Sequence, residues 1–201
     1  LRNLGIDFEV VGISEVDRYA ILAYDAIHNN QEYIGEFTKE EMLREFEEKH
    51  IAYNFSSGKS EIPKSFNDIK RLYNAHMRSK NYGDIQLINP SDLPQMDLFT
   101  YSFPCKCISL AGRQEGLEEG SGTQSSLVWE CFKIIEYHKP KYLLMENVKN
   151  LVSNKFKPYF DMVCEELERL GYNNYWSVLN GKDFNVPQNR ERVMMLSIRK
   201  D

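Results

Sequence analysis

The stretch Ser102-Phe103-Pro104-Cys105-Lys106-Cys107-Ile108-Ser109 and the later run Tyr142-Leu143-Leu144-Met145-Glu146-Asn147-Val148 decide the fold expected for this chain. In the first, a cysteine follows a proline at the end of an apolar run, where a strand breaks into a loop. In the second, a carboxylate emerges at the end of another apolar run. The carboxyl ends of neighbouring parallel strands line one crevice, and ligands bind there. We therefore expect a thiol and a carboxyl group in one crevice, where they could do covalent chemistry on an electron-poor ring.

Around these two runs, strand patterns alternate with helix patterns. Strands are expected over 8–15, 97–103, 142–145, 175–179 and 193–198, and helices over 20–27, 68–79, 123–137 and 155–170. This alternation predicts an α/β fold with a parallel-type sheet and a late antiparallel hairpin. Residues 31–82 break the pattern, and we interpret them as a helical insertion without recognisable chemistry. A capping box of Thr38 and Glu41 predicts one of its helices.

Composition limits the class of protein. A chain of 201 residues with 42% hydrophobic and 12% aromatic residues is long enough for one folded α/β domain, which we place over 1–201. Apolar runs fall short of the roughly 18 residues needed to span a bilayer, and the start does not resemble a signal peptide, so a cytoplasmic protein is expected. Cys131 and Cys164 fall on apolar helix faces as small hydrophobes. The four histidines lack zinc spacing, so we expect no metal.

Pro104-Cys105 together with Glu146-Asn147-Val148 resembles the catalytic pair of the DNA cytosine-5 methyltransferases. Carbon 5 of cytosine is a poor nucleophile until a thiolate adds to carbon 6 and ring nitrogen 3 is protonated. The resemblance implies that Cys105 is the nucleophile and Glu146 the proton donor. Cys107 is the rival nucleophile, and Glu146 alone could also be a salt-bridge partner; the proline before Cys105 favours Cys105.

Further motifs extend the resemblance over most of the chain outside residues 31–82. Ser14-Glu15-Val16-Asp17-Arg18-Tyr19-Ala20 is similar to the motif whose acid takes the ribose hydroxyls of S-adenosylmethionine. Gly83-Asp84-Ile85 resembles the motif whose aspartate accepts from the adenine amino group, with the isoleucine on the ring. Gly122-Thr123-Gln124-Ser125-Ser126-Leu127 resembles the start of the helix beneath the cofactor. The implied cofactor-binding residues are Glu15, Val16, Asp84, Ile85, Pro104 and Leu127.

The run Gln188-Asn189-Arg190-Glu191-Arg192 is the most specific match after the cysteine. By resemblance, Arg192 would meet the carbonyl oxygen of a base flipped out of the duplex, and Arg190 would orient Glu146. The implied substrate-binding residues are Asn147, Gln188 and Ser109. The loop 110–120 is expected to close over the base, and its Arg113 is either a DNA contact or a plain surface charge.

Some features depart from the family pattern. Lys106 stands where the family usually has glutamine, and a cation beside the thiol would favour the thiolate. The chain begins after the glycine-rich loop and ends after the arginine motif, so the target-recognition domain is expected to be absent. The net charge of −5 agrees with the expected absence of segments that bind DNA, because contacts with phosphate groups are made by basic residues. The resemblance thus implies a Rossmann-like S-adenosylmethionine-dependent methyltransferase sheet with helices on both faces, incomplete at both ends.

The resemblance implies methyl transfer from S-adenosylmethionine to carbon 5 of cytosine in double-stranded DNA. We expect a restriction-modification enzyme that works as a monomer in the bacterial cytosol or nucleoid. Two alternatives stay open. One is a transfer-RNA cytosine-5 methyltransferase with the same catalytic groups, and the other is an inactive remnant that serves as a scaffold.

Overall fold

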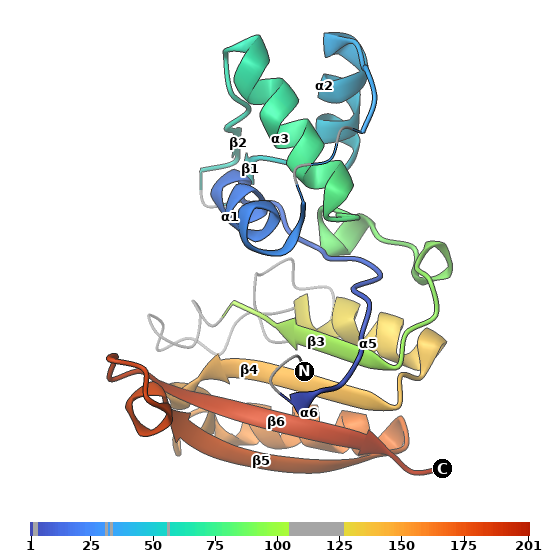
Figure 1. Ribbon diagram of the computed structural model, residues 1–201. Helices are drawn as coiled ribbons and strands as arrows, with labels where there is room; N and C mark the ends of the chain where they lie inside the picture. The colour runs from blue at the N-terminus through green and yellow to red at the C-terminus, as the bar shows by residue number, and fades with distance from the viewer. Residues whose placement is uncertain (2–3, 31, 33, 56, 105–126) are drawn as a thin grey trace. The chain divides into compact units, whose positions relative to one another are not determined.

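A computed structural model describes residues 1, 4–30, 32, 34–55, 57–104 and 127–201 (Figure 1). The chain divides into two compact units, Leu1–Pro94 and Gln95–Asp201. Each unit is described below by itself. The expectation of a single catalytic domain over 1–201 stays a prediction.

The N-terminal unit is mainly helical. It contains α1 (Arg18–His28), α2 (Lys39–Glu48) and α3 (Phe66–Arg78), a small antiparallel pair of β1 (Tyr53–Asn54) and β2 (Lys59–Ser60), and the short 3-10 helices η2 (Ile85–Leu87) and η3 (Pro90–Asp92). Side chains of Asp17, Thr38 and Ser65 cap the three α-helices at their N-termini. Thr38 and Glu41 form the complete capping box, as predicted.

The helices within residues 31–82 share one hydrophobic core with α1. The core consists of Ile21, Met42, Phe46, Ile51, Ala52, Ile69, Leu72, Tyr73 and Ala75. A buried ion pair also joins α1 to α3, with Arg78 Nη2 at 2.6 Å from Asp25 Oδ2. Segment 31–82 is therefore as much a part of this unit's core as α1 is.

The buried strand expected over 8–15 does not form. Its only sheet contact is an isolated parallel bridge between Ile13 and Asn81. Phe8 and Val10 are exposed, at 44% and 43%. An apolar strand is buried only when neighbouring strands and a covering layer flank it, and the described residues supply no strand along 8–12.

The C-terminal unit is an α/β sheet. Its elements are β3 (Leu98–Ser102), α5 (Leu127–His138), β4 (Tyr142–Val148), η5 (Lys149–Val152), α6 (Lys157–Arg169), β5 (Tyr172–Asn180), η6 (Gly181–Phe184) and β6 (Glu191–Arg199). The strand order is β3-β4-β6-β5, with β3 parallel to β4 and the other pairs antiparallel. The predicted late antiparallel hairpin is confirmed. The helix expected over 155–170 ends with Leu170 as its C-cap, and Gly171 follows with a φ of +95°.

Both helices of this unit pack on one face of the sheet. Tyr101 lies near Cys131 of α5 and Cys164 of α6, and burial raises the pKa of Tyr101 well above its ordinary value. Cys164 Sγ lies 3.8 Å from Met195 Sδ on the same face. The described residues of this unit therefore supply the helices of a single face, where helices on both faces were expected.

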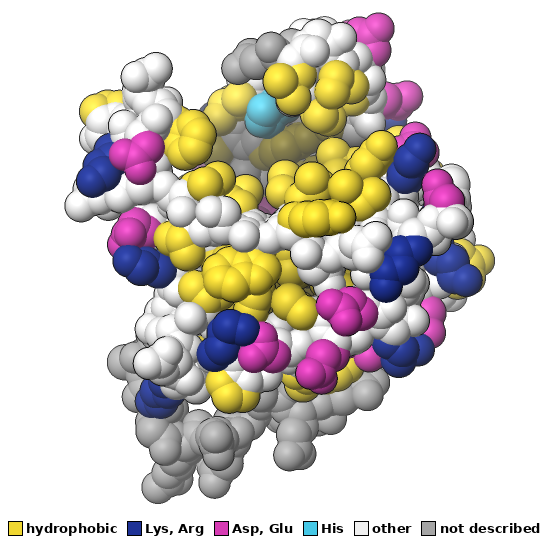
Figure 2. Space-filling view, turned by 90° about the horizontal axis from the view of Figure 1, so that it is seen from below, with side chains coloured by type: hydrophobic (Ala, Val, Ile, Leu, Met, Phe, Trp, Pro, Cys, Tyr) yellow, Lys and Arg dark blue, Asp and Glu magenta, His cyan; other side chains and the backbone are white. Residues whose placement is uncertain are grey.

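The opposite face of the sheet carries apolar side chains that none of the described helices of this unit covers. Tyr175 and Leu196 pair across β5 and β6 and are 59% and 40% exposed. Hydrophobic side chains also lie among charged ones on the surface that Figure 2 shows. None of the described helices is long and apolar enough to cross a membrane.

Candidate active site and cofactor site

The ends of β3 and β4 bring the two sequence motifs together. Ser102 and Glu146 are register partners across this parallel pair, so Glu146 stands beside the strand that leads into Pro104. Phe103, between Ser102 and Pro104, is buried. The expected residues Cys105, Cys107, Ser109 and Arg113 lie outside the described residues, so their positions are not tested.

Asn147 anchors the chain directly before Pro104. Its side chain is buried, and Nδ2 donates a hydrogen bond of 3.0 Å to the carbonyl oxygen of Phe103. Its Oδ1 accepts from the backbone N–H of Val148 at 2.9 Å. Successive side chains of a strand point to opposite faces, so Asn147 points away from the face of Glu146. This geometry favours a positioning role, while the substrate contact expected of Asn147 stays a prediction.

Glu146 forms an ion pair with Arg192. Arg192 Nε lies 2.7 Å from Glu146 Oε1, and their side chains are 22% and 41% exposed. The two residues share a face because Val148, two residues after Glu146, is the register partner of Arg192. We expected Arg190 to make this contact. In the structure Arg192 makes it. Arg192 lies in β6, where it pairs with Val148 of β4, whereas Arg190 precedes the first residue of β6.

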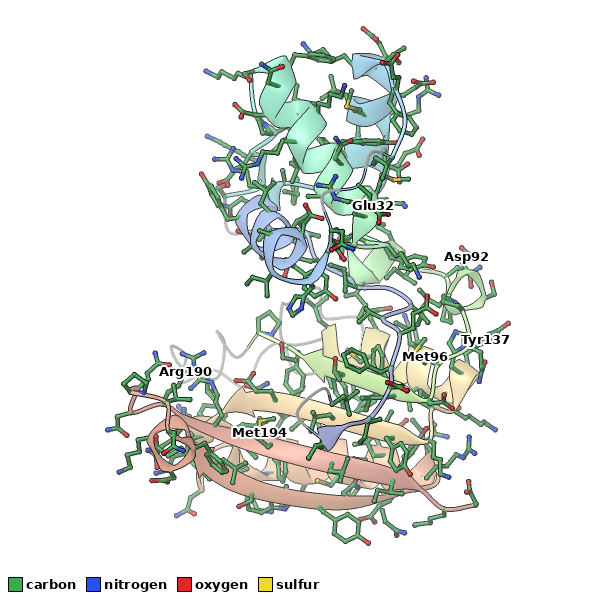
Figure 3. All side chains as sticks on the ribbon, in the orientation of Figure 1. Glu32, Asp92, Met96, Tyr137, Arg190 and Met194 are labelled. Atoms are coloured by element: carbon green, nitrogen blue, oxygen red, sulfur yellow. The ribbon has the colours of Figure 1, made fainter. Side chains whose placement is uncertain are left out.

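Residues 180–190 form the turn that presents the arginine motif. Asn180 Oδ1 accepts from the backbone N–H of Arg190 at 3.1 Å, and its Nδ2 donates to Asn189 Oδ1 at 2.7 Å. The side chains of Arg190 and Gln188 are exposed. In Figure 3, Arg190 lies at the start of β6 and Met194 farther along it. Their contacts with a substrate stay predictions.

The N-terminal unit joins the two segments that carry the expected cofactor residues. The buried side chain of Asn81 accepts from the backbone N–H groups of Glu15 and Gly83, at 3.0 and 3.1 Å, and donates to the carbonyl oxygen of Glu15 at 2.9 Å. Glu15 Oε1 accepts from the backbone N–H groups of Val16 and Asp17, both at 2.8 Å. Asn81, which the sequence analysis did not single out, thus joins the backbone of Glu15 to that of Gly83, the residue before Asp84.

Asp84 is the most buried of the expected cofactor residues, with 5% of its side chain exposed. Its Oδ1 accepts from the backbone N–H of Gln86 at 3.0 Å, and its Oδ2 lies 2.8 Å from His50 Nδ1. Sequence reasoning missed His50 because it lies in the segment interpreted as an insertion without chemistry. A histidine after a helix has no spacing pattern that points to a partner 34 residues away.

The remaining described residues include two cysteines, the expected cofactor residue Leu127 and the candidate metal ligands. Burial raises the pKa of Cys131 to about 12 and that of Cys164 to about 11, so both stay protonated thiols at neutral pH. Leu127 is the first residue of α5 and is half-buried. In the described part of the chain, no group of three His, Cys, Asp or Glu side chains is placed to hold a metal ion.

Comparisons with known proteins identify relatives of this sequence. A model of the family "C-5 cytosine-specific DNA methylase" matches residues 46–201. The chain is 48% identical to "Type II methyltransferase M2.ScrFI" of Lactococcus lactis subsp. cremoris, over 98% of this chain and 56% of the relative. It is 38% identical to "Orphan methyltransferase M.SssI" of Spiroplasma monobiae, over 95% of this chain and 53% of the relative. The chain thus spans about half the length of these relatives.

A solved structure shares the fold. The Entamoeba histolytica methyltransferase EhMeth aligns over 97% of this chain and 54% of its own, with a TM-score of 0.52 and 15% sequence identity. At this identity the likeness concerns the fold alone. It agrees with the mixed sheet described above and confirms the predicted Rossmann-like α/β fold.

Proposed function

This chain belongs to the C-5 cytosine-specific DNA methylase family, and from that premise we propose that it is the catalytic core of a DNA cytosine-5 methyltransferase. It would transfer a methyl group from S-adenosylmethionine to carbon 5 of cytosine in double-stranded DNA. The name of its Lactococcus relative supports a restriction-modification role in a bacterial cytosol. Action as a monomer, without a metal, stays a prediction.

The chemistry assigns a separate task to each side chain. The Cys105 thiolate adds to carbon 6 of the ring, forming a carbon–sulfur bond, while Glu146 gives a proton to nitrogen 3. This leaves an electron-rich carbon 5. The cofactor, when bound, would supply an electrophilic methyl group to carbon 5 and leave as S-adenosylhomocysteine. Loss of the carbon 5 proton to water, expulsion of the thiolate and return of the nitrogen 3 proton to Glu146 would then restore the ring and the free cysteine.

The ion pair between Glu146 and Arg192 constrains this scheme. A carboxylate paired with a guanidinium is only an acceptor, so Glu146 must take up a proton before it can donate to nitrogen 3. An arriving base that draws Arg192 onto its carbonyl oxygen would weaken the 2.7 Å pair and free the carboxyl group of Glu146 to face nitrogen 3. Arg192 would thus contact Glu146 before the base arrives and the carbonyl oxygen of the base afterwards.

The described residues fit the adenosine end of S-adenosylmethionine. Asp84 is a carboxylate, an acceptor that matches the amino group of adenine. Glu15 is held by the backbone of Val16 and Asp17 through one oxygen, Oε1. Its other oxygen, Oε2, makes no hydrogen bond to a described residue, so it is available to ribose hydroxyls. Ile85, half-buried beside Asp84, offers an apolar surface for the ring.

One observation carries the proposal. The structure puts Glu146 beside Ser102, three residues before Cys105, with Arg192 in contact with the carboxylate. Glu146 and Arg192 thus supply the proton donor and the cation of the proposed chemistry beside the strand that leads toward Cys105, and this supports the proposal. The transfer-RNA alternative uses the same groups, so a substrate experiment must decide between the two nucleic acids.

The test is methyl transfer by the protein expressed at its full natural length. We expect label from S-adenosylmethionine to enter double-stranded DNA, and Cys105→Ala to abolish it while Cys131→Ala, a change in α5, leaves it. Label on transfer RNA alone would overturn the DNA proposal. Label on neither nucleic acid would support the inactive-remnant alternative.

A further inference from the structure

The turn after α2 contacts both segments that carry the proposed cofactor residues. Ala52 donates its backbone N–H to the carbonyl oxygen of Val16 at 2.8 Å, and Asp84 donates its own to the carbonyl oxygen of Lys49 at 3.0 Å. The turn therefore forms a bridge within the N-terminal unit from residue 16 to residue 84. Its side chains are placed to influence both cofactor motifs.

His50 is held in an unusual backbone conformation at the centre of this turn. Its φ is +54°, and Ala52 nearby has a φ of +59°, values that side-chain-bearing residues rarely adopt. The neighbouring Ile51 fixes the turn, because it is buried and donates its backbone N–H to Phe46 at 2.8 Å. This bond and the one of 3.4 Å from the His50 N–H to the carbonyl oxygen of Glu47 are those of a helix C-terminus that ends on a left-handed residue, so the end of α2 sets the conformation of His50.

The conformation of the turn directs the imidazole of His50 at Asp84. Nδ1 lies 2.8 Å from Asp84 Oδ2, and the ring stacks on Tyr53 with centroids 5.2 Å apart. Because Gln86 N–H binds the other oxygen, the Asp84 carboxylate is held by a donor on each side. Each carboxylate oxygen can accept more than one hydrogen bond, so this fixed carboxylate keeps the capacity to accept from a ligand.

We propose that His50 is a positioning residue that fixes Asp84 so that the site selects an amino-substituted purine over an oxo-substituted one. The proposal rests on the proposed function, in which Asp84 accepts from the adenine amino group. A purine with an oxygen at position 6 places an acceptor opposite the carboxylate, and a rigid site rejects it because neither group can supply a proton. A carboxylate free to rotate could turn away and lose this selectivity.

The experiment compares binding of S-adenosylhomocysteine and S-inosylhomocysteine by isothermal titration calorimetry, on the protein at its full natural length. These ligands differ in the amino or oxo group at the purine position that faces Asp84. His50→Gly suits a positive φ but removes the donor. His50→Asn also tolerates a positive φ and returns an N–H near the Nδ1 position. His50→Gln is a second donor-displacing variant, and His28→Asn is the control at an exposed histidine of the same unit.

We expect the wild type, His28→Asn and His50→Asn to prefer the adenosyl ligand by at least about tenfold, since a hydrogen bond to a charged group is worth about that much. His50→Gly and His50→Gln should lower this preference to about threefold or less. Equal preference in the wild type and in either donor-removing variant would overturn the positioning role. Failure of the wild type to bind S-adenosylhomocysteine would instead overturn the cofactor proposal itself, so the two failures are distinguishable.

Discussion

Replacing Asn147 by alanine should destabilise the C-terminal unit by about 2–4 kcal/mol. The change removes the donor to the Phe103 carbonyl oxygen and the acceptor for the Val148 N–H, at 3.0 and 2.9 Å. Phe103 is 4% exposed, so its carbonyl group would be left buried without a partner, at a cost of about 1–3 kcal/mol. The Val148 N–H is less buried and adds the smaller share.

Urea unfolding followed by tryptophan fluorescence measures this effect. The chain's two tryptophans, Trp129 and Trp176, both belong to the C-terminal unit, so the signal reports on that unit alone. Asn173→Ala is the matched control, since Asn173 is an exposed asparagine of β5, and it should change stability by less than about 0.5 kcal/mol. A loss for Asn147→Ala no larger than the control's would refute the anchoring of Phe103 by this side chain.

Three further predictions concern the N-terminal unit, and far-UV circular dichroism during denaturation checks each of them. Gly83→Ala should cost at least about 2 kcal/mol, since its φ is +76° and an added Cβ would lie 2.2 Å from the carbonyl oxygen of Lys49; Gly58→Ala, with φ +65° and open space, should cost about 1 kcal/mol. Arg78→Met should cost about 3 kcal/mol by removing the cation that pairs with the buried Asp25 carboxylate, and a loss below about 1 kcal/mol would contradict this. Burial lowers the pKa of His76 below 6.5, so the unfolded chain binds a proton at this histidine more readily than the folded unit does. The free energy of unfolding should therefore fall as the pH drops below about 6.5, and His76→Gln should reduce that dependence.

Sequence patterns predicted the C-terminal unit well because its signals are local. Apolar runs bounded by polar turns marked β3, β4, β5 and β6, and apolar residues at helical spacing marked α5 and α6. The strands β4, β5 and β6 extend beyond their predicted bounds, whereas β3 and α6 are one or two residues shorter at each end. In β4, for instance, pairing with β6 continues through Val148, three residues past the predicted end at Met145. Backbone pairing between strands, rather than apolar content, sets where a strand stops.

The expectations that failed depended on contacts across long sequence separations. Residues 8–15 have the composition of a strand, but a strand forms only where partners pair with it. The pairing of Glu146 with Arg192, where Arg190 was expected, reflects register, which a one-dimensional motif does not specify. Asn81 and His50 were missed because their hydrogen-bond partners, Glu15 and Asp84, lie 66 and 34 positions away in the sequence. Their neighbours in sequence do not indicate these contacts.

Covalent trapping on a DNA duplex that contains 5-fluorocytosine tests the central claim most directly. Fluorine at carbon 5 cannot leave as a proton does, so the carbon–sulfur adduct persists and can be isolated. With the protein at its full natural length and S-adenosylmethionine present, we expect a stable adduct for the wild type and for Cys107→Ala, and none for Cys105→Ala. An adduct that persists in Cys105→Ala and disappears in Cys107→Ala would contradict the assignment of the nucleophile, and no adduct with any variant would contradict the covalent mechanism.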